Sequence, residues 1–242
     1  MARAGVVRSP QAHLHSLQAM SLGADVPDHE RAIAWIDAAY VRAFLGRAAS
    51  AVRRHQQQLS RLDAVLGDGD HGDNLEIGFR AVEATLRDLP ADTPPGELLR
   101  AAGHRLVAAV GGASGPLYGT AFIEAGFVAG EAARVDGTRL AEMFAVAADG
   151  LARRGRCTVG DKTILDTLRP AADTFGRNVA AGAQPIDAIV AAVQAARAGM
   201  LSTRDLVARR GLALRLGPRS AGTLDPGAVS CFLLVLALVP RR

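Results

Sequence analysis

The sequence predicts an all-α protein of eight helices in which consecutive helices run antiparallel. Hydrophobic residues make up 49% of the 242 residues but aromatic residues only 4%, and alanine is abundant, which favours close-packed helices. Thr, Ile and Tyr are sparse, which weighs against a large β-sheet. Apolar residues recur every three or four positions through most of the chain, and the breaks between these stretches are mostly short.

The predicted helices are bounded mostly by Pro, Gly or Asp, the residues that commonly start or stop a helix. Their expected ranges are approximately 28–62, 74–89, 95–110, 116–133, 138–154, 161–181, 186–209 and 228–239. Asp28 and Asp161 are the expected N-caps of the first and sixth helices, and Pro116 suits the first turn of the fourth. Residues 211–227 are expected to form a long loop before the last helix.

Composition excludes several classes of protein. The basic excess is +4, from 28 basic and 24 acidic residues, and the arginines form no stripe with aromatics, so we expect no nucleic-acid partner. The longest late apolar run, Phe232–Val239, falls far short of the ~20 residues that span a bilayer. Cys157 and Cys231 form no CxxC or zinc pattern, which predicts a reduced, cytoplasmic setting.

The organisation expected from this pattern is a single domain over residues 28–242. Residues 1–27 contain Arg3 and Arg8 but no continuous apolar core, so they are a poor signal peptide and are expected to form a disordered extension. No internal repeat or long linker divides the remaining chain.

An acidic stretch from Asp63 to Asn74 is the strongest chemical signal. It contains four carboxylates, an imidazole and an amide among three glycines. Carboxylates crowded in this way repel each other unless a cation lies between them, and hard oxygen ligands favour Mg²⁺ or Ca²⁺. An EF-hand is excluded because, counting from Asp68, Asp73 replaces the required Gly and Phe79 the required Glu. A solvated acidic turn is the plain alternative.

His71 lies inside this stretch and has three interpretations. It is a metal ligand, a hydrogen-bond donor to phosphate or a loop residue. Donation to phosphate is favoured over ligation because Mg²⁺ prefers oxygen.

Three further stretches have both a functional and a structural interpretation. Gly111–Pro116 lacks the Gly-Lys-Ser/Thr ending of a Walker A loop, yet a glycine-rich loop that runs into a helix attracts anions. An ordinary glycine turn explains it equally well. Around Lys162, the only lysine, helix capping is favoured over anion binding. The arginines near the last loop are favoured as a solvated surface; they are Arg209, Arg210, Arg215 and Arg219.

Together these motifs resemble the nucleotide-binding L subunit of dihydroxyacetone kinase. The matching blocks occur in the order of that family and extend from about Ile33 to the end of the chain. They are Leu62–Asp63, Gly67–Gly72, Asn74, Gly111–Thr120, Gly160–Thr163, Ala208–Gly211, Leu216–Gly217, Arg219–Ser220 and Asp225–Ala228. Any one block is a weak signal, but the set is specific.

The resemblance implies an eight-helix antiparallel up-and-down barrel with ADP or ATP and two Mg²⁺ ions at one end. By motif position, the expected metal ligands are Asp63, Asp68 and Asp70. The expected nucleotide contacts are His71, Gly72, Asp73, Asn74, Ala113, Ser114, Gly155, Ile164, Asp225, Pro226 and Gly227. No residue is expected to act as a covalent nucleophile.

The resemblance also implies partners and a reaction. A separate K subunit would hold dihydroxyacetone or a related ketose, and this chain would supply the phosphoryl group by positioning and charge neutralisation. The nucleotide would be either retained ADP, rephosphorylated by a phosphohistidine protein of the phosphoenolpyruvate phosphotransferase system, or exchanging ATP. A homodimer is left open. Other hypotheses are a nucleotide-sensing module with weakened catalysis and a purely structural helical protein.

Two departures from the family pattern stand out. Asp73 occupies a position where an uncharged residue is expected, so its charge needs a compensating group or an outward rotamer. Leu212 replaces an arginine that contacts nucleotide in the family's lid loop. Loss of a well-formed charged contact to phosphate costs roughly 1.5–3 kcal/mol. Arg215 lies close enough in sequence to replace it.

Overall fold

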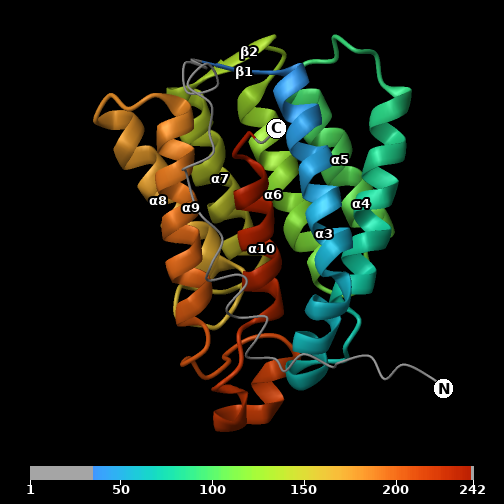
Figure 1. The fold of residues 1–242 in the computed structure, drawn as a ribbon, viewed down its shortest axis with the longest axis vertical. Helices are drawn as coiled ribbons and strands as arrows, with labels where there is room; N and C mark the ends of the chain where they lie inside the picture. The colour runs from blue at the N-terminus through green and yellow to red at the C-terminus, as the bar shows by residue number, and fades with distance from the viewer. Residues whose placement is uncertain (1–34, 241–242) are drawn as a thin grey trace, which may run out of the picture.

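The protein is a closed barrel of antiparallel helices, described here for residues 35–240 of a computed structural model (Figure 1). The elements are β1 (Trp35–Asp37), α3 (Ala38–Leu66), α4 (His71–Asp88), α5 (Pro95–Ala109), α6 (Ser114–Ala129), β2 (Arg134–Asp136), α7 (Gly137–Gly155), α8 (Leu165–Ala180), α9 (Pro185–Ser202), the 3₁₀ helix η1 (Leu212–Ser220) and α10 (Pro226–Ala237). Each α-helix packs against the next along the chain, and α10 closes the ring against α3. The predicted all-α barrel of eight helices is therefore confirmed within the described residues.

The up-and-down order sends alternate helices in opposite directions. As a result α4, α6, α8 and α10 all begin at the lower end of the barrel in Figure 1, where α3 ends. Three helix starts in the described residues are capped by an aspartate that accepts a hydrogen bond from a backbone N–H three residues later. These caps are Asp37, Asp136 and Asp225.

The final helix α10 forms part of the core and is apolar on all sides. All its residues except Gly227 are buried. It also contacts α8 and α9, so nearly its whole circumference is covered. A helix buried on every side needs no polar face, which explains the continuous apolar run in its sequence. Among the described helices, none is long and apolar enough to cross a membrane.

The start of the first helix differs from the prediction. Residues 35–37 form β1, which pairs antiparallel with β2 so that Ile36 lies opposite Val135, and α3 starts only after Asp37. Ile36 and Val135 are both buried by this pairing. The expected N-cap Asp28 and the proposed extension 1–27 lie outside the described residues.

Other helix boundaries also differ from the predicted ones. The fourth helix ends at Ala129, where Gly130 adopts a positive φ of 62°, and the seventh ends at Ser202, well before Arg209. The second helix begins earlier than expected, at His71, and the last at Pro226. The expected loop of residues 211–227 contains the 3₁₀ helix η1.

Asp161 does not cap the sixth helix, which starts at Leu165. Lys162 adopts the left-handed conformation (φ 61°), and this breaks the helix that the sequence predicts there. The carboxylate of Asp166 instead accepts hydrogen bonds from the backbone N–H groups of Gly160 (2.5 Å) and Thr163 (2.6 Å).

Candidate functional site

A pocket of about 830 Å³ opens at the end of the barrel where α4, α6, α8 and α10 begin. This volume is in the range of small-molecule and cofactor sites. The positive dipole end of each of these helices points toward it, an arrangement that favours an anion. All the residues predicted to bind metal or nucleotide line it except Gly72 and Asp73.

The acidic loop brings Asp63, Asp68 and Asp70 together. Each of the three offers a carboxylate oxygen, and these oxygens lie within 4.8 Å of one another. Within residues 35–240 this is the only group of three His, Cys, Asp or Glu side chains with that geometry. Oxygen-only ligands suit Mg²⁺ or Ca²⁺, so the three predicted ligands are spaced to share a hard cation.

Asp63 organises the loop from the last turn of α3. Its Oδ2 accepts hydrogen bonds from three successive backbone N–H groups, those of Gly69 (3.0 Å), Asp70 (3.1 Å) and His71 (3.2 Å). Burial raises the pKa of Asp63 above its ordinary value; the backbone bonds oppose this rise and the nearby Asp68 adds to it. A cation shared with Asp68 would reverse the repulsion between the two carboxylates.

His71 is a buried residue of the pocket lining, and both of its ring nitrogens have hydrogen-bond partners. Its Nδ1 lies 3.0 Å from Ser114 Oγ, and its Nε2 lies 2.8 Å from Ser230 Oγ. Burial lowers the pKa of His71 to about 4, with a small opposing effect from the Pro226 carbonyl, so the ring is neutral near pH 7. Donation from the ring to phosphate, as the sequence suggested, would require one of these bonds to break.

Gly72 lies where α4 packs closely against the backbone of α3. A Cβ atom added there would lie 2.0 Å from the backbone oxygen of Gln56, so any side chain would push α4 away from α3. Glycine is therefore required for the close approach of the two helices at the base of the acidic loop.

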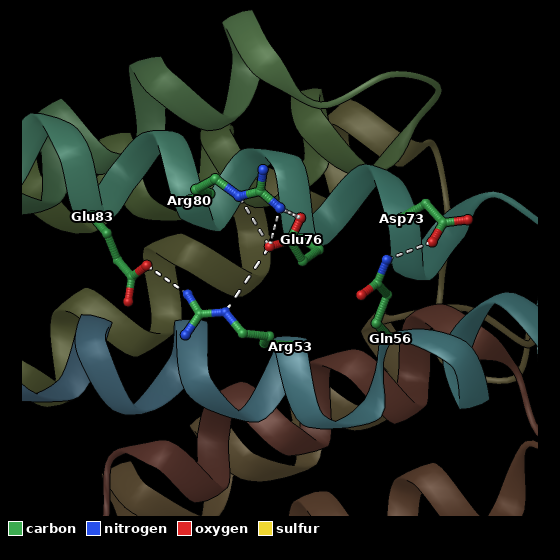
Figure 2. Close-up of polar contacts among 6 residues, drawn as sticks. All are labelled: Arg53, Gln56, Asp73, Glu76, Arg80 and Glu83. Atoms are coloured by element: carbon green, nitrogen blue, oxygen red, sulfur yellow. Dashed lines mark hydrogen bonds and ion pairs between the residues drawn. The ribbon is translucent and has the colours of Figure 1, made fainter.

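Asp73 does not line the pocket, and its side chain reaches toward Gln56 of α3 (Figure 2). Its Oδ1 accepts a hydrogen bond from Gln56 Nε2 at 2.7 Å across the outer surface of α3 and α4. The same surface carries ion pairs in which Glu76 meets Arg53 and Arg80. Asp73 thus adopts an outward rotamer, which is one of the two ways expected from the sequence to accommodate its extra charge.

The opposite wall comes from the starts of α8 and α10. Ile164 lies just before α8 and Gly155 ends α7, and both line the pocket beside the turn Asp225–Gly227. Asp225 caps α10 through a 2.7 Å bond from Ala228 N–H. Burial raises the pKa of Asp225 to about 7, although this capping bond and the charge of Lys162 oppose the rise.

The segment from Arg204 to Gly222, here called the lid, covers one side of the pocket and contains η1. Leu212 and Arg215 of this segment both line the pocket. They are three residues apart in a 3₁₀ helix, which has three residues per turn, so their side chains project from the same face. The lid packs on the barrel through a small cluster: Leu66, Ala208, Ala213 and Leu216.

Lys162 holds the two residues that flank the lid, one at each end. Its buried Nζ donates to the backbone oxygens of Thr203 and of Thr223 (2.5 Å). The first and last residues of the lid are also joined, by a 2.7 Å hydrogen bond from Gly222 N–H to the Arg204 backbone oxygen. Burial lowers the pKa of Lys162, and nearby carboxylates, Asp225 first among them, oppose this.

Asp161 makes a second attachment for the lid. Its carboxylate pairs with Arg210 at 3.3 Å, and its backbone oxygen accepts from Arg209 N–H at 3.0 Å. Sequence reasoning treated the Lys162 stretch as a helix cap and so missed this role. The one available signal was that a chain rich in arginine keeps a single lysine there.

Comparison with known proteins identifies the family. The DAK2 domain model matches residues 65–240, and the chain belongs to the DAK2 domain family. More particularly, it is similar to the proteins named ADP-binding subunit DhaL of phosphoenolpyruvate-dependent dihydroxyacetone kinases. The identity is 38% with one from Listeria innocua (83% of this chain, 93% of the relative) and 35% with one from Escherichia coli (82% and 95%).

Longer relatives and solved structures agree with this assignment. An L-erythrulose 1-kinase of Mycolicibacterium smegmatis is 36% identical over 76% of this chain but only 32% of its own length. The dihydroxyacetone kinase of C. freundii, in complex with AMP-PNP and Mg²⁺, shares the fold with a TM-score of 0.62 and 25% identity. The match covers 90% of this chain and 37% of that kinase chain.

Proposed function

We propose that this chain is the nucleotide-binding, phosphoryl-transferring subunit of a kinase for dihydroxyacetone or a related ketose. The observation that carries the proposal is the convergence of three carboxylates and four helix starts on one pocket of about 830 Å³. The carboxylates suit Mg²⁺ and the helix starts suit phosphate, so together they fit a Mg-bound ADP or ATP. The names of the DhaL relatives support the same ligand.

Asp63, Asp68 and Asp70 would hold two Mg²⁺ ions, which when bound supply charge neutralisation across the phosphate oxygens. The chain's own contribution is positioning. The starts of α4 and α6 offer backbone N–H groups to phosphate, and the lid excludes water from one side. The nucleoside would lie toward Gly155, Ile164 and the turn Asp225–Gly227.

The substrate and the donor come from partners in this proposal. A separate K subunit would hold the ketose at the open mouth of the pocket. The donor would be either a phosphohistidine protein of the phosphotransferase system, which rephosphorylates retained ADP, or free ATP. A relative from Lactococcus lactis is named a PTS-dependent kinase subunit, which favours the first. The cytoplasmic location, the homodimer and the disordered extension 1–27 stay predictions.

Titration calorimetry with ADP, with and without Mg²⁺, tests the proposal. Asp68→Ala should weaken Mg-ADP binding by roughly a hundredfold or more because it removes a direct metal ligand. Asp88→Ala is the matched control, since Asp88 is an exposed carboxylate at the far end of α4. If Asp68→Ala binds Mg-ADP as well as the unchanged chain does, the metal assignment is wrong.

Leu212 favours a second candidate, an ADP-sensing regulatory module with weakened catalysis. It places an apolar side chain on the pocket face of the lid, where a cation would help transfer. Reconstitution with a K subunit and a phosphoryl donor separates the two functions. Turnover supports the kinase, whereas tight Mg-ADP binding without turnover supports the sensor.

A further inference from the structure

Thr203 lies between the lid and the turn Asp225–Gly227 and is fully buried. It directly follows α9 and precedes Arg204, the first residue of the lid. Its backbone oxygen accepts a hydrogen bond from Lys162 Nζ, and its Oγ1 accepts one from the Asp225 N–H at 3.1 Å. This one residue therefore contacts both the lysine that holds the lid and a turn in the wall of the pocket.

The directions of the hydrogen bonds of the Thr203 hydroxyl are fixed by the atoms involved. The Asp225 backbone N–H can only donate, so Thr203 Oγ1 accepts from it. The Met200 backbone oxygen, 2.7 Å from the same Oγ1, can only accept, so the hydroxyl proton is directed there. Thr203 does not line the pocket, so its hydroxyl acts by position and not by contact with a ligand.

The lid is closed on itself at its base, which consists of Thr203, Arg204, Gly222 and Thr223. A 2.7 Å hydrogen bond joins Gly222 N–H to the Arg204 oxygen, and Lys162 holds the oxygens of Thr203 and Thr223. A loop whose ends are joined in this way opens by turning about a few residues at its ends. We therefore expect Thr203 to shift whenever the base of the lid moves.

The turn is held on one side by its own helix and on the other by the base of the lid. Within α10, the Asp225 carboxylate accepts from Ala228 N–H at 2.7 Å, and the Asp225 backbone oxygen accepts from Val229 N–H at 3.0 Å. Toward the lid, Thr223 lies two residues before Asp225, and the Thr203 hydroxyl accepts from Asp225 N–H. The turn is thus tied to the base of the lid twice, by the chain and by Thr203.

We propose that Thr203 is a positioning residue that couples the lid to the turn Asp225–Gly227, so that the turn takes its ligand-binding position only while the base of the lid is closed. The proposal deepens the proposed function and rests on it, because the turn is a predicted nucleotide contact. Coupling of this kind is reciprocal, so a nucleotide that fixes the turn also favours the closed lid.

Hydrogen exchange of the chain without ligand, followed by NMR, tests the coupling by itself. The reporters are the N–H groups of Ala228 and Val229, which donate to Asp225. Leu216→Ala should loosen the lid, because Leu216 packs in the cluster that joins the lid to the barrel and does not line the pocket. It should speed exchange at the reporters about threefold to tenfold when Thr203 is present and cause no further change in Thr203→Val, which keeps the side-chain shape without the hydroxyl.

Affinity for Mg-ADP then connects the coupling with function. Thr203→Val should weaken Mg-ADP binding about threefold to tenfold in calorimetry and speed release of a fluorescent ADP analogue by a similar factor. Thr203→Ser retains the hydroxyl and should bind Mg-ADP within about twofold of the unchanged chain. The control is Thr93→Val, which removes a buried hydroxyl that donates to the Pro90 oxygen at the far end of the barrel. It should lower the melting temperature and leave the reporters and the affinity unchanged.

Two results would overturn the coupling and leave the proposed function intact. One is equal acceleration by Leu216→Ala with and without the Thr203 hydroxyl. The other is a Thr203→Ser variant as impaired as Thr203→Val, which would mean that packing matters and the hydroxyl does not. An unchanged chain that binds no Mg-ADP would overturn the proposed function and, with it, the role of Thr203 in ligand binding.

Discussion

The floor and the lid of the pocket are held in opposite ways. The floor, made of the acidic loop and the starts of α4, α6 and α10, is held by partly buried hydrogen bonds to Asp63 and by the buried contact between His71 and Ser230. The lid packs on a separate small cluster of four residues that includes Leu66, and its attachment depends on Lys162 and Asp161. Regions with few buried contacts open most easily, so we expect the floor to set affinity and the lid to set exchange.

The largest expected effect comes from disturbing the floor at Gly72. Gly72→Ala places a Cβ atom 2.0 Å from the Gln56 backbone oxygen, which a backbone shift alone can relieve. We expect a loss of about 3 kcal/mol or more in the free energy of unfolding, measured by chemical denaturation. Gly46→Ala on α3, where nothing lies within 4 Å, should instead be neutral or stabilise by about 0.5–1 kcal/mol. Equal effects would contradict the close approach of α3 and α4.

Detaching the lid at Lys162 should have the next largest effect. Lys162→Met leaves the Thr203 and Thr223 oxygens without their buried donor, at a cost of about 2–3 kcal/mol in stability. We expect release of a fluorescent ADP analogue to become about tenfold faster in stopped-flow displacement. Arg219→Met, which removes an exposed cation of the lid outside the pocket, should leave the release rate unchanged. An unchanged rate in Lys162→Met would mean that the anchor does not control exchange.

Asp225 lies where floor and lid meet, and its raised pKa predicts a pH effect. The folded state keeps a proton up to a pKa of about 7, whereas the unfolded chain loses it near 3.8. Stability should therefore fall as pH rises between these values, by about 2 kcal/mol from about pH 5 to 6.5. Asp225→Asn, which can still cap α10, should flatten that slope in denaturation curves measured without metal. A slope equal to that of the unchanged chain would show that Asp225 ionises normally.

The smallest expected effect tests the charge of the lid. Leu212→Arg adds a cation on the face that lines the pocket and should tighten Mg-ADP binding about threefold to tenfold. The gain is limited because Arg215 already projects from the same face of η1. Leu214→Arg adds the same charge to the lid outside the pocket and should change affinity by less than about twofold. Equal gains from both variants would point to general attraction across the lid.

The sequence was sufficient for features that depend on neighbours along the chain. Helix periodicity predicted the eight helices, and the family resemblance named Asp63, Asp68 and Asp70, whose carboxylates the structure brings together. That they hold a metal ion stays a prediction. Pairing of Ile36 with Val135 was missed because the two residues are distant in sequence and each strand has only three residues. The direction of Asp73 depends on Gln56, one helix away, and no local pattern reveals it.

The role of Lys162 in the lid was also missed, because its contacts are with residues distant in the sequence. Its local sequence reads as a helix cap, but its partners Thr203 and Thr223 lie far along the chain. The resemblance to a family placed this stretch in a matching block without giving it a role. Only the contacts made in the folded structure show that Lys162 anchors the lid and does not cap a helix.

The two ends of the described barrel meet at the end opposite the pocket. The Tyr40 hydroxyl donates to the Leu238 oxygen, so the start of α3 and the close of α10 are in contact there (Figure 1). Another domain joined by a covalent linker at either end would leave the pocket mouth free. This geometry is compatible with both settings in which similar sequences occur, since the match covers 95% of the DhaL subunit from Escherichia coli and 32% of the longer kinase from Mycolicibacterium smegmatis.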